Sequence, residues 1–451
     1  MRNDVKPKNA IVAAVQLPSV SDIEFEASLA ELRDLAKTLG YTICASFTQK
    51  RSSFDSTAYM GTGKREVIRA FVDNQPIPID FPKSSHAPAD PEAGKIDVIF
   101  VDHEISPSQA RNLEKEVGCE VMDRTMVILE IFQRHASSRA ARAQVEIARL
   151  GYMAPRLREA AKLAGPQGRQ RSGTGGRGAG ESHTELDRRK VRDRIAELQQ
   201  EIDAMDVERK TQRARRQDRQ GGANVALVGY TNAGKSTLMR ALTGSDVLVE
   251  DKLFATLDTT VRALQPESKP RVLVSDTVGF IKNLPHGLVA SFKSTLEEAL
   301  DASLLLHVID ASDPGFERQL AVTDKVLAEI GAKDVPRIRV FNKIDNLSMG
   351  GDSLGPAELE STLRSQYPDC IVMSARRAAD VAKLRQALIA FFQTGLVEAK
   401  LFLPWSAQQH RGVIFATCEV LAEHANDDGA CLHVRGENQV VKSLLEQFGP
   451  A

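Results

Sequence analysis

The sequence predicts a multidomain α/β protein with a long helical hairpin near its middle. Apolar runs of strand length alternate with helix-length segments in residues 1–124 and again from residue 221 onward, an arrangement typical of α/β domains. Residues 125–220 lie between these regions and have helical patterning instead. The chain has 451 residues, and at roughly 150 residues per domain this length favours about three domains.

Residues 1–124 are predicted to form a small α/β domain with a mostly parallel sheet. Buried strands are expected at 8–17, 41–46, 96–101 and 119–122, and helices at 24–39, 64–72 and 106–118. The first helix should end at Gly40, and the last should begin at Ser106-Pro107. The proline-containing segment 75–95 is predicted to be a surface loop.

Residues 125–220 are predicted to form an antiparallel hairpin of two long helices. Apolar residues of the second helix recur at intervals of 4, 3, 4 and 3 positions, the spacing of a coiled-coil seam: Val191, Ile195, Leu198, Ile202 and Met205. The connecting tip, residues 165–181, is rich in glycine and is expected to be flexible. It carries Arg169, Arg171 and Arg177.

The formal net charge of −1 conceals a basic segment. Residues 134–219 contain 21 basic and 12 acidic side chains, a net of +9, which leaves 38 basic and 48 acidic side chains elsewhere. This asymmetry favours an anionic partner for the hairpin. The alternative is a solvated helix surface, because Arg and Glu alternate along many exposed helices.

Two global features favour a reducing compartment and no membrane span. The five cysteines are far apart and include no Cys-x-x-Cys pair, so neither a disulfide framework nor a zinc site is predicted. No apolar stretch reaches the length of about 18 residues that a membrane helix needs, and the apolar run at 10–15 is too short for a signal peptide. We therefore expect a monomeric cytoplasmic protein, with a peripheral membrane contact left open.

Residues 221–397 are predicted to form a second α/β domain of the Rossmann-like type, with strands at 224–228, 271–275, 304–310, 337–341 and 370–373. A loop matching G-x-x-x-x-G-K-[ST] follows the first strand. It consists of Gly229, Tyr230, Thr231, Asn232, Ala233, Gly234, Lys235 and Ser236. Such a loop points backbone N–H groups at the β- and γ-phosphates, while Lys235 adds a positive charge and the Ser236 hydroxyl ligates Mg²⁺. The loop alone does not separate ATP from GTP.

Three further loops follow later strands and favour GTP. In the first (Asp276, Thr277, Val278 and Gly279), the carboxylate can hold Mg²⁺ through water and the Gly279 amide can meet the γ-phosphate. In the second (Asn342, Lys343, Ile344 and Asp345), the Asp345 carboxylate can accept from N1–H and N2–H₂ of guanine. The third (Ser374, Ala375 and Arg376) backs the base. Each loop alone could be a simple turn or helix cap, but four in this order, each after a predicted strand, predict a GTPase.

These motifs resemble those of the translation-factor-related GTPases and, within them, the HflX family. The resemblance covers nearly the whole chain. It includes GYTNAGKST at 229–237, DTVGF at 276–280 and LPHGLVASFKSTLEE at 284–298, and in the N-terminal half YMGTGK at 59–64, ISPSQARNLEKE at 105–116 and VMDRTMVILEIF at 121–132. The resemblance implies a GTPase that associates with the large (50S) ribosomal subunit and acts in ribosome splitting, rescue or assembly.

The resemblance also implies roles for a segment between the first two motifs. This segment would contact the nucleotide as part of the first switch: Phe254, Ala255, Thr256, Leu257 and Asp258. Ser236 and Thr256 would ligate Mg²⁺, and Lys235, Thr256 and Gly279 would serve catalysis. Two positions depart from the family pattern. Asp258 precedes Thr-Thr rather than Pro-Thr, so the choice of threonine stays open, and residues 178–181 read GAGE rather than GPGE, which predicts a more mobile tip.

Two residues indicate that GTP hydrolysis differs from that of many GTPases. Phe280 stands where many GTPases carry the Gln that orients the attacking water, so we expect slow basal hydrolysis that a partner such as the ribosome accelerates. The alternative reading of Phe280 is core packing. Asn232 resembles the Asn that coordinates K⁺ in cation-activated relatives, whereas the alternative is an Asn that satisfies loop amides.

Residues 398–451 are predicted to form a small α+β domain with a strand at 400–403, a helix at 411–423, a strand at 430–435 and a helix at 438–448. For the whole chain we expect a Mg²⁺-dependent GTPase whose Arg-bearing hairpin tip contacts the rRNA of the 50S subunit. Two rivals stay open. One is a regulatory switch acting on a protein or membrane partner, and the other is a nucleotide-driven RNA remodeller with an extra nucleotide site in residues 1–124.

Overall fold

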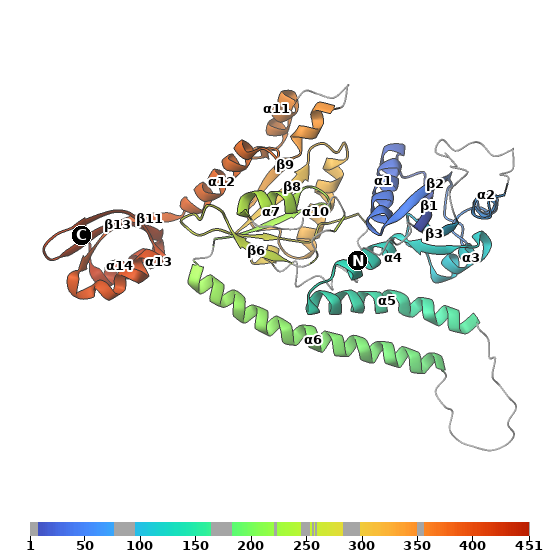
Figure 1. The fold of residues 1–451 in the computed structure, drawn as a ribbon, viewed down its shortest axis with the longest axis horizontal. Helices are drawn as coiled ribbons and strands as arrows, with labels where there is room; N and C mark the ends of the chain where they lie inside the picture. The colour runs from blue at the N-terminus through green and yellow to red at the C-terminus, as the bar shows by residue number, and fades with distance from the viewer. Residues whose placement is uncertain are drawn as a thin grey trace, which may run out of the picture. The chain divides into compact units, whose positions relative to one another are not determined.

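The computed structural model describes residues 8–75, 95–163, 183–220, 223–244, 253–254, 257, 259–282, 298–349 and 356–450. These residues form two compact units (Figure 1). The first unit comprises the described residues up to Met205 together with Leu253, Phe254 and Leu257, and the second comprises the other described residues from Asp206 onward. Within the described ranges, no helix is long and apolar enough to cross a membrane.

A four-stranded parallel sheet with the order β2-β1-β3-β4 forms the centre of the first unit. Its strands are β1 (Lys8–Gln16), β2 (Tyr41–Lys50), β3 (Ile96–Val101) and β4 (Glu120–Asp123). The helices that belong with this sheet are α1 (Asp22–Thr38), α2 (Thr62–Val72), α3 (Pro107–Val117) and α4 (Arg124–His135). The predicted parallel α/β domain is confirmed, and β2 extends four residues beyond its predicted end.

Local sequence explains these elements. Residues 10–15 of β1 are at most 1% exposed, as expected for a central strand of a parallel sheet that is covered on both faces. At the start of α3, the Ser106 hydroxyl accepts the N–H of Gln109, and the Gln109 side chain accepts the N–H of Ser106. The helix ends at Gly118, whose φ of 80° lies in the left-handed region that glycine tolerates.

The helical hairpin consists of α5 (Arg139–Leu163) and α6 (His183–Gln220), which run side by side (Figure 1). Three of the predicted seam residues pack against α5 near Ala143: Leu198, Ile202 and Met205. Glu146 pairs with Arg194 at 3.0 Å, whereas Arg139, which precedes Glu146, pairs with Glu201, which follows Arg194, at 4.0 Å. The helices are therefore antiparallel, as predicted.

The helical pattern that begins near residue 125 is interrupted at residues 136–138. Its first part, α4, buries Ile128, Ile131 and Phe132 completely, so α4 belongs to the core of the α/β part of the unit. Ser138 then begins α5, because its hydroxyl accepts the N–H of Ala141 at 3.1 Å.

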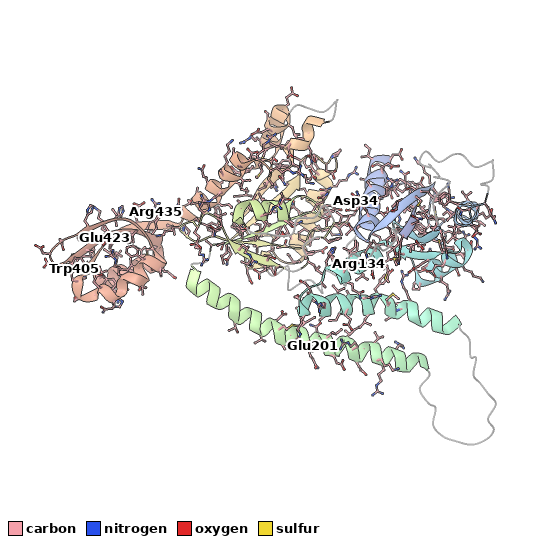
Figure 2. The ribbon with its side chains drawn as sticks, in the orientation of Figure 1. Asp34, Arg134, Glu201, Trp405, Glu423 and Arg435 are labelled. Carbon is pink, nitrogen blue, oxygen red and sulfur yellow. The ribbon has the colours of Figure 1, made fainter. Side chains whose placement is uncertain are left out.

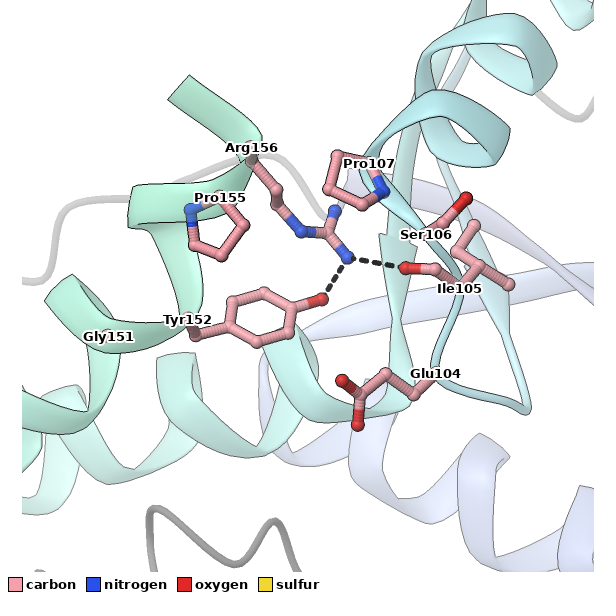
Figure 3. A pocket seen from close by; sticks show the side chains of 8 residues that line it. All are labelled: Glu104, Ile105, Ser106, Pro107, Gly151, Tyr152, Pro155 and Arg156. Atoms are coloured by element: carbon pink, nitrogen blue, oxygen red, sulfur yellow. Dashed lines mark hydrogen bonds between the residues drawn. The ribbon is translucent and has the colours of Figure 1, made fainter. Parts of the chain in front are cut away.

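Asp123 fastens α5 to the carboxyl end of the sheet. Arg156 Nη2 donates to Asp123 Oδ2 at 2.7 Å and to the Ile105 carbonyl at 3.2 Å, and the Tyr152 hydroxyl also donates to Asp123. Figure 3 shows Arg156, Tyr152 and Ile105 among the residues that line a pocket of about 460 Å³. Since Asp123 is fully buried, losing Arg156 would leave a buried charge without its cation. The contacts among these groups make the pocket part of this helix attachment, and we assign it no ligand.

A six-stranded sheet with the order β10-β9-β8-β5-β7-β6 forms the centre of the second unit. Its strands are β5 (Asn224–Gly229), β6 (Thr260–Ala263), β7 (Leu273–Asp276), β8 (Leu304–Asp310), β9 (Arg337–Asn342) and β10 (Ile371–Val372). The helical elements of this part are α7 (Lys235–Thr243), α10 (Phe316–Glu329), η1 (Ile344–Met349), α11 (Pro356–Gln366) and α12 (Ala378–Gln393). The predicted Rossmann-like domain is confirmed. The antiparallel edge strand β6 was not predicted, because TVRA lacks an apolar run.

The C-terminal part of the second unit is a three-stranded antiparallel sheet with the order β11-β13-β12. Its elements are β11 (Leu396–Pro404), η2 (Trp405–His410), α13 (Arg411–Thr417), β12 (Glu419–Ala425), β13 (Gly429–Glu437) and α14 (Asn438–Phe448). Figure 2 labels Trp405, Glu423 and Arg435 in this sheet and its flanking segments.

The predicted helix over 411–423 is wrong beyond Thr417, because residues 419–425 form β12 and pair with β13. Asn426 explains the difference. Its Oδ1 accepts the N–H groups of Asp428 and Gly429 at 3.1 and 2.8 Å, which closes a tight turn between the two strands. Cross-strand pairing then outweighs the helical preference of the preceding residues.

His307 is a buried titratable group in β8. It is 1% exposed, and its backbone pairs with Val228 of β5 and Arg339 of β9. Burial, together with the nearby charges of Arg337 and Arg339, lowers the pKa of His307 from 6.5 to about 3. The unfolded chain therefore binds a proton between these two values while the folded chain does not.

We predict that folding stability falls as the pH drops below about 6.5, by about 2 kcal/mol at pH ~5, because the folded state excludes the imidazolium. Urea unfolding at several pH values would measure this loss, and His307→Gln should have a shallower pH dependence whatever its absolute stability. Equal slopes for the two proteins between pH ~6.5 and ~4 would contradict the assignment.

Candidate functional site

The loops singled out by sequence lie at the carboxyl ends of strands in the six-stranded sheet. Residues 229–236 follow β5, residues 276–279 follow β7, and residues 342–345 follow β9. The strands are parallel neighbours in the order β9-β8-β5-β7, so their carboxyl ends meet at one edge. This edge is where open α/β sheets bind ligands.

The glycine-rich loop has positive φ angles at two residues, and the Lys235 side chain forms hydrogen bonds within it. Asn232 and Gly234 have φ values of 58° and 94°. The Lys235 Nζ donates to the carbonyls of Gly229 and Tyr230 at 3.0 and 2.7 Å. Burial lowers the pKa of Lys235 from 10.5 to about 8. The loop therefore holds a desolvated cation next to the N-terminus of α7, a place suited to phosphate oxygens.

Ser236 and Asp276 provide oxygen groups beside that cation. The Ser236 hydroxyl donates to Asp276 Oδ2 at 2.8 Å, and Asp276 is fully buried. A hydroxyl and a carboxylate are the hard oxygen ligands that Mg²⁺ prefers, so this pair fits the predicted metal site. Within the described ranges, no group of three or more His, Cys, Asp or Glu side chains could hold a metal ion.

The loop after β7 is joined to the glycine-rich loop by backbone hydrogen bonds. Thr231 N–H donates to the Phe280 carbonyl at 2.8 Å, and Phe280 N–H donates to the Gly229 carbonyl at 3.1 Å. A side-chain carbon at Gly279 would lie 2.9 Å from Lys235 Nζ and 2.9 Å from Thr231 Cα. Only glycine therefore fits this close approach.

The Phe280 ring packs in the core. It is 2% exposed and lies in an apolar cluster with Ala226, Val228 and Leu305. The core-packing interpretation therefore describes its side chain correctly. A buried phenyl ring also offers no hydrogen bond to water, so this position does not supply the function that Gln serves in many GTPases.

Asn342 joins the loops after three strands. Its Nδ2 donates to the Ala233 carbonyl at 3.0 Å, and its Oδ1 accepts the N–H of Ala375 at 2.9 Å. Gly234 is essential to this contact, because a side-chain carbon there would lie 2.3 Å from Asn342 Nδ2. The sequence placed these loops at strand ends, and the structure shows that one amide side chain connects them.

Asp345, in the loop after β9, lies close to Arg376 and Ser374, in the loop after β10. Burial alone would raise the pKa of the Asp345 carboxyl, but the hydrogen bond from Ser374 and the charges of Arg376 and Arg377 hold it below its usual value. Arg376 Nη1 is 3.7 Å from Asp345 Oδ2, and its side chain is 78% exposed. Asp345 is therefore a stable carboxylate that can accept two N–H groups.

Two residues that contact predicted site residues were missed by sequence reasoning. Lys343 pairs with Asp310 at 2.7 Å, and the Ser374 amide donates to Asp380 at 3.0 Å. Asp310 is the last residue of β8. Its position at the carboxyl edge of the sheet could have identified it from the sequence. Three other predicted site residues are buried, and their contacts with a nucleotide stay predictions: Thr277, Val278 and Ile344.

Part of the predicted first switch lies in the first unit. Phe254 is 3% exposed, and its ring is 4.6 Å from that of Phe132, while the Leu253 N–H donates to the Thr38 hydroxyl at 3.2 Å. Leu257 is buried as well. Ala255, Thr256 and Asp258 lie outside the described residues, as do Arg169, Arg171 and Arg177 of the hairpin tip. Their assigned contacts stay predictions.

Three family models match the chain in succession. A model described as GTP-binding GTPase N-terminal matches residues 26–133, and one described as GTP-binding GTPase Middle Region matches residues 135–216. A third, described as 50S ribosome-binding GTPase, matches residues 224–343.

Known relatives resemble the chain over most of its length. GTPase HflX of Gluconacetobacter diazotrophicus is 52% identical over 443 residues, covering 94% of this chain and 94% of its own length. GTPase HflX of Magnetococcus marinus is 38% identical over 430 residues, covering 95% and 92%. Among solved structures, a GTP-binding protein from Sulfolobus solfataricus in complex with GDP is 22% identical, with a TM-score of 0.44, covering 84% of this chain and 99% of its own.

Gly234→Ala tests the packing of the glycine-rich loop. We expect it to cost more stability than the left-handed penalty of about 1–2 kcal/mol and to weaken GDP binding more than about tenfold, because the methyl group collides with Asn342. Gly244→Ala is a matched control, since Gly244 also has a positive φ but its nearest neighbour atom is 4.0 Å away. Urea unfolding and GDP titration measure both effects. Equal results for the two variants would refute the collision.

Proposed function

The chain belongs to the GTPase HflX family, and from that premise we propose that it is a Mg²⁺-dependent GTPase switch acting on the 50S ribosomal subunit, in ribosome splitting, rescue or biogenesis during translation stress. GTP hydrolysis itself follows from the family. The observation that carries the proposal is the convergence of the phosphate and base loops on Asn342. The match of residues 224–343 to a 50S ribosome-binding GTPase supports the partner. Such a partner fits a cytoplasmic protein.

Phosphate binding is assigned to the loop 229–236. Lys235 is desolvated and bonded to two loop carbonyls. Nearby phosphates favour the charged form of a lysine, so a bound triphosphate would raise the lowered pKa of Lys235 and gain a strong partner. The Gly279 amide, beside Lys235 Nζ, would meet the γ-phosphate.

Ser236 would hold Mg²⁺ directly and Asp276 would hold it through water, with Thr256 as the further ligand that the resemblance implies. When bound, the ion neutralises charge that develops on the phosphates. Asp276 is buried and accepts from Ser236, so the two oxygen groups are already oriented toward each other.

Base selection is assigned to Asp345. Its lowered pKa keeps it a carboxylate, which can accept from N1–H and N2–H₂ of guanine. Adenine lacks this pair of donors, so its binding would leave the carboxylate unsatisfied. Arg376 Nη1, 3.7 Å away, places a positive charge near the carboxylate.

We assign binding of the 50S subunit to the basic hairpin. The surface of α6 carries many charged side chains, and Arg188, Arg189 and Arg192 are exposed. Lysine and arginine neutralise backbone phosphates of RNA, and the resulting affinity depends on salt. Arg169, Arg171 and Arg177 of the tip would reach irregular RNA.

Sedimentation tests the proposal directly. With 70S, 50S and 30S particles, we expect the protein to pellet with 50S more strongly in a non-hydrolysable GTP analogue than in GDP, because γ-phosphate contacts order switch segments. We also expect 50S subunits to accelerate hydrolysis. Pelleting with anionic liposomes but not with ribosomal particles would favour the membrane alternative and overturn this partner.

A triple alanine variant at Arg169, Arg171 and Arg177 should reduce 50S pelleting and flatten its salt dependence. The matched control removes three exposed arginines of the second unit: Arg271, Arg318 and Arg364. The control should pellet like the wild type. If both variants lose binding equally, net charge rather than the hairpin tip explains the affinity.

We further propose that K⁺ activates hydrolysis through Asn232. Its side chain is exposed, and its φ is 58°, so the amide is available to an ion rather than to the core. Hydrolysis should be faster in K⁺ than in Na⁺, and Asn232→Ala should remove that difference. Equal rates of hydrolysis by the wild type in the two salts would instead indicate that Asn232 serves only as a residue that tolerates left-handed backbone angles.

A further inference from the structure

Thr231 has a buried hydroxyl in the glycine-rich loop. The residue is 6% exposed, and within the described part of the chain its Oγ1 has no hydrogen-bond partner. Its backbone is fully engaged, because its N–H donates to the Phe280 carbonyl at 2.8 Å. A buried hydroxyl without a partner costs free energy, and most such groups in native proteins are paired.

Neighbouring hydroxyls show that this is a local exception. Thr277 Oγ1 donates to the Leu227 carbonyl at 2.7 Å, Ser275 Oγ to the Val225 carbonyl at 3.3 Å, and Thr243 Oγ1 to the Met239 carbonyl at 2.8 Å. Each of these groups satisfies a backbone carbonyl in the same sheet or helix. The Thr231 hydroxyl is the exception among these four, and it lies in the phosphate loop.

The Thr231 side chain lies close to the groups that we assign to the γ-phosphate. A side-chain carbon at Gly279 would lie 3.0 Å from Thr231 Cγ2 and 2.9 Å from Lys235 Nζ. Lys235 and the Gly279 amide are the groups assigned to the γ-phosphate, so Thr231 lies beside both. A hydroxyl can donate one hydrogen bond and accept others.

Because the Phe280 side chain cannot orient the attacking water, another group must do so, and the Thr231 hydroxyl can. The Phe280 ring is in the core and cannot orient water. The same residue's carbonyl is bonded to Thr231 N–H, so the Thr231 backbone is held against this loop. Fixed donors and acceptors near the reacting atoms are the main source of catalysis in phosphoryl transfer.

We propose that Thr231 is a further catalytic residue, whose hydroxyl accepts a hydrogen bond from the water that attacks the γ-phosphorus. The water oxygen bonds to phosphorus, the bond to the β–γ bridging oxygen breaks, and GDP leaves with that electron pair. The proton of the water passes to the phosphate released, while Thr231 keeps its own proton. The inference rests on the GTPase activity of the proposed function.

Thr231→Val tests the inference, because valine keeps the shape and removes the hydroxyl. We expect kcat to fall about tenfold, the effect of one lost hydrogen bond in the transition state, with KM and GDP affinity unchanged. Thr231→Ser should retain kcat within about twofold. Both are measured without and with 50S subunits.

Thr243→Val is the matched control, since Thr243 is equally buried and its hydroxyl bonds a helix carbonyl. It should lose stability without changing kcat. Wild-type kcat in Thr231→Val would overturn the proposal, and so would equal slowing in Thr231→Ser or a parallel loss of GDP affinity, which indicates a structural effect on the loop. Absence of GTP hydrolysis by the wild type would refute the proposed function instead.

Discussion

The Asn342 side chain is the contact on which the rest of the site depends. One amide group donates to the Ala233 carbonyl and accepts the Ala375 N–H, so it sets the distance between the phosphate loop and the loop that backs the base. It is 2% exposed. Removing it would leave a buried carbonyl and a buried N–H without partners, which is more costly than the loss of the two bonds alone.

The sheet beneath Asn342 explains why such a contact is possible. Parallel strands β9, β8, β5 and β7 lie side by side, so every loop that follows them emerges at one edge. The loop after β7 is further bonded to the phosphate loop through Gly229, Thr231 and Phe280. A change in the backbone of one loop would therefore move the other, as the proposed switch requires.

Sequence reasoning predicted this edge but not its internal bonds. The motifs at 229–236, 276–279, 342–345 and 374–376 identified the four loops, because phosphate and guanine recognition demand particular residues at fixed spacing. The pairing of Lys343 with Asp310 depends on side-chain positions in three dimensions. So does the Thr231 hydroxyl, which has no partner among the described residues. No local pattern encodes them. Likewise, β12 replaced a predicted helix because its partner strand β13 lies beyond the turn at Asn426.

The sequence by itself determined the fold class and the nucleotide chemistry, since hydrophobic periodicity and loop motifs are local properties of the chain. It also located the basic hairpin, which the net charge of −1 conceals. Only the tertiary structure decided which groups are buried and bonded. Burial lowers the pKa values of Lys235 and His307 and places the Phe280 ring in the core. These properties arise from desolvation and packing, which exist only once distant segments meet.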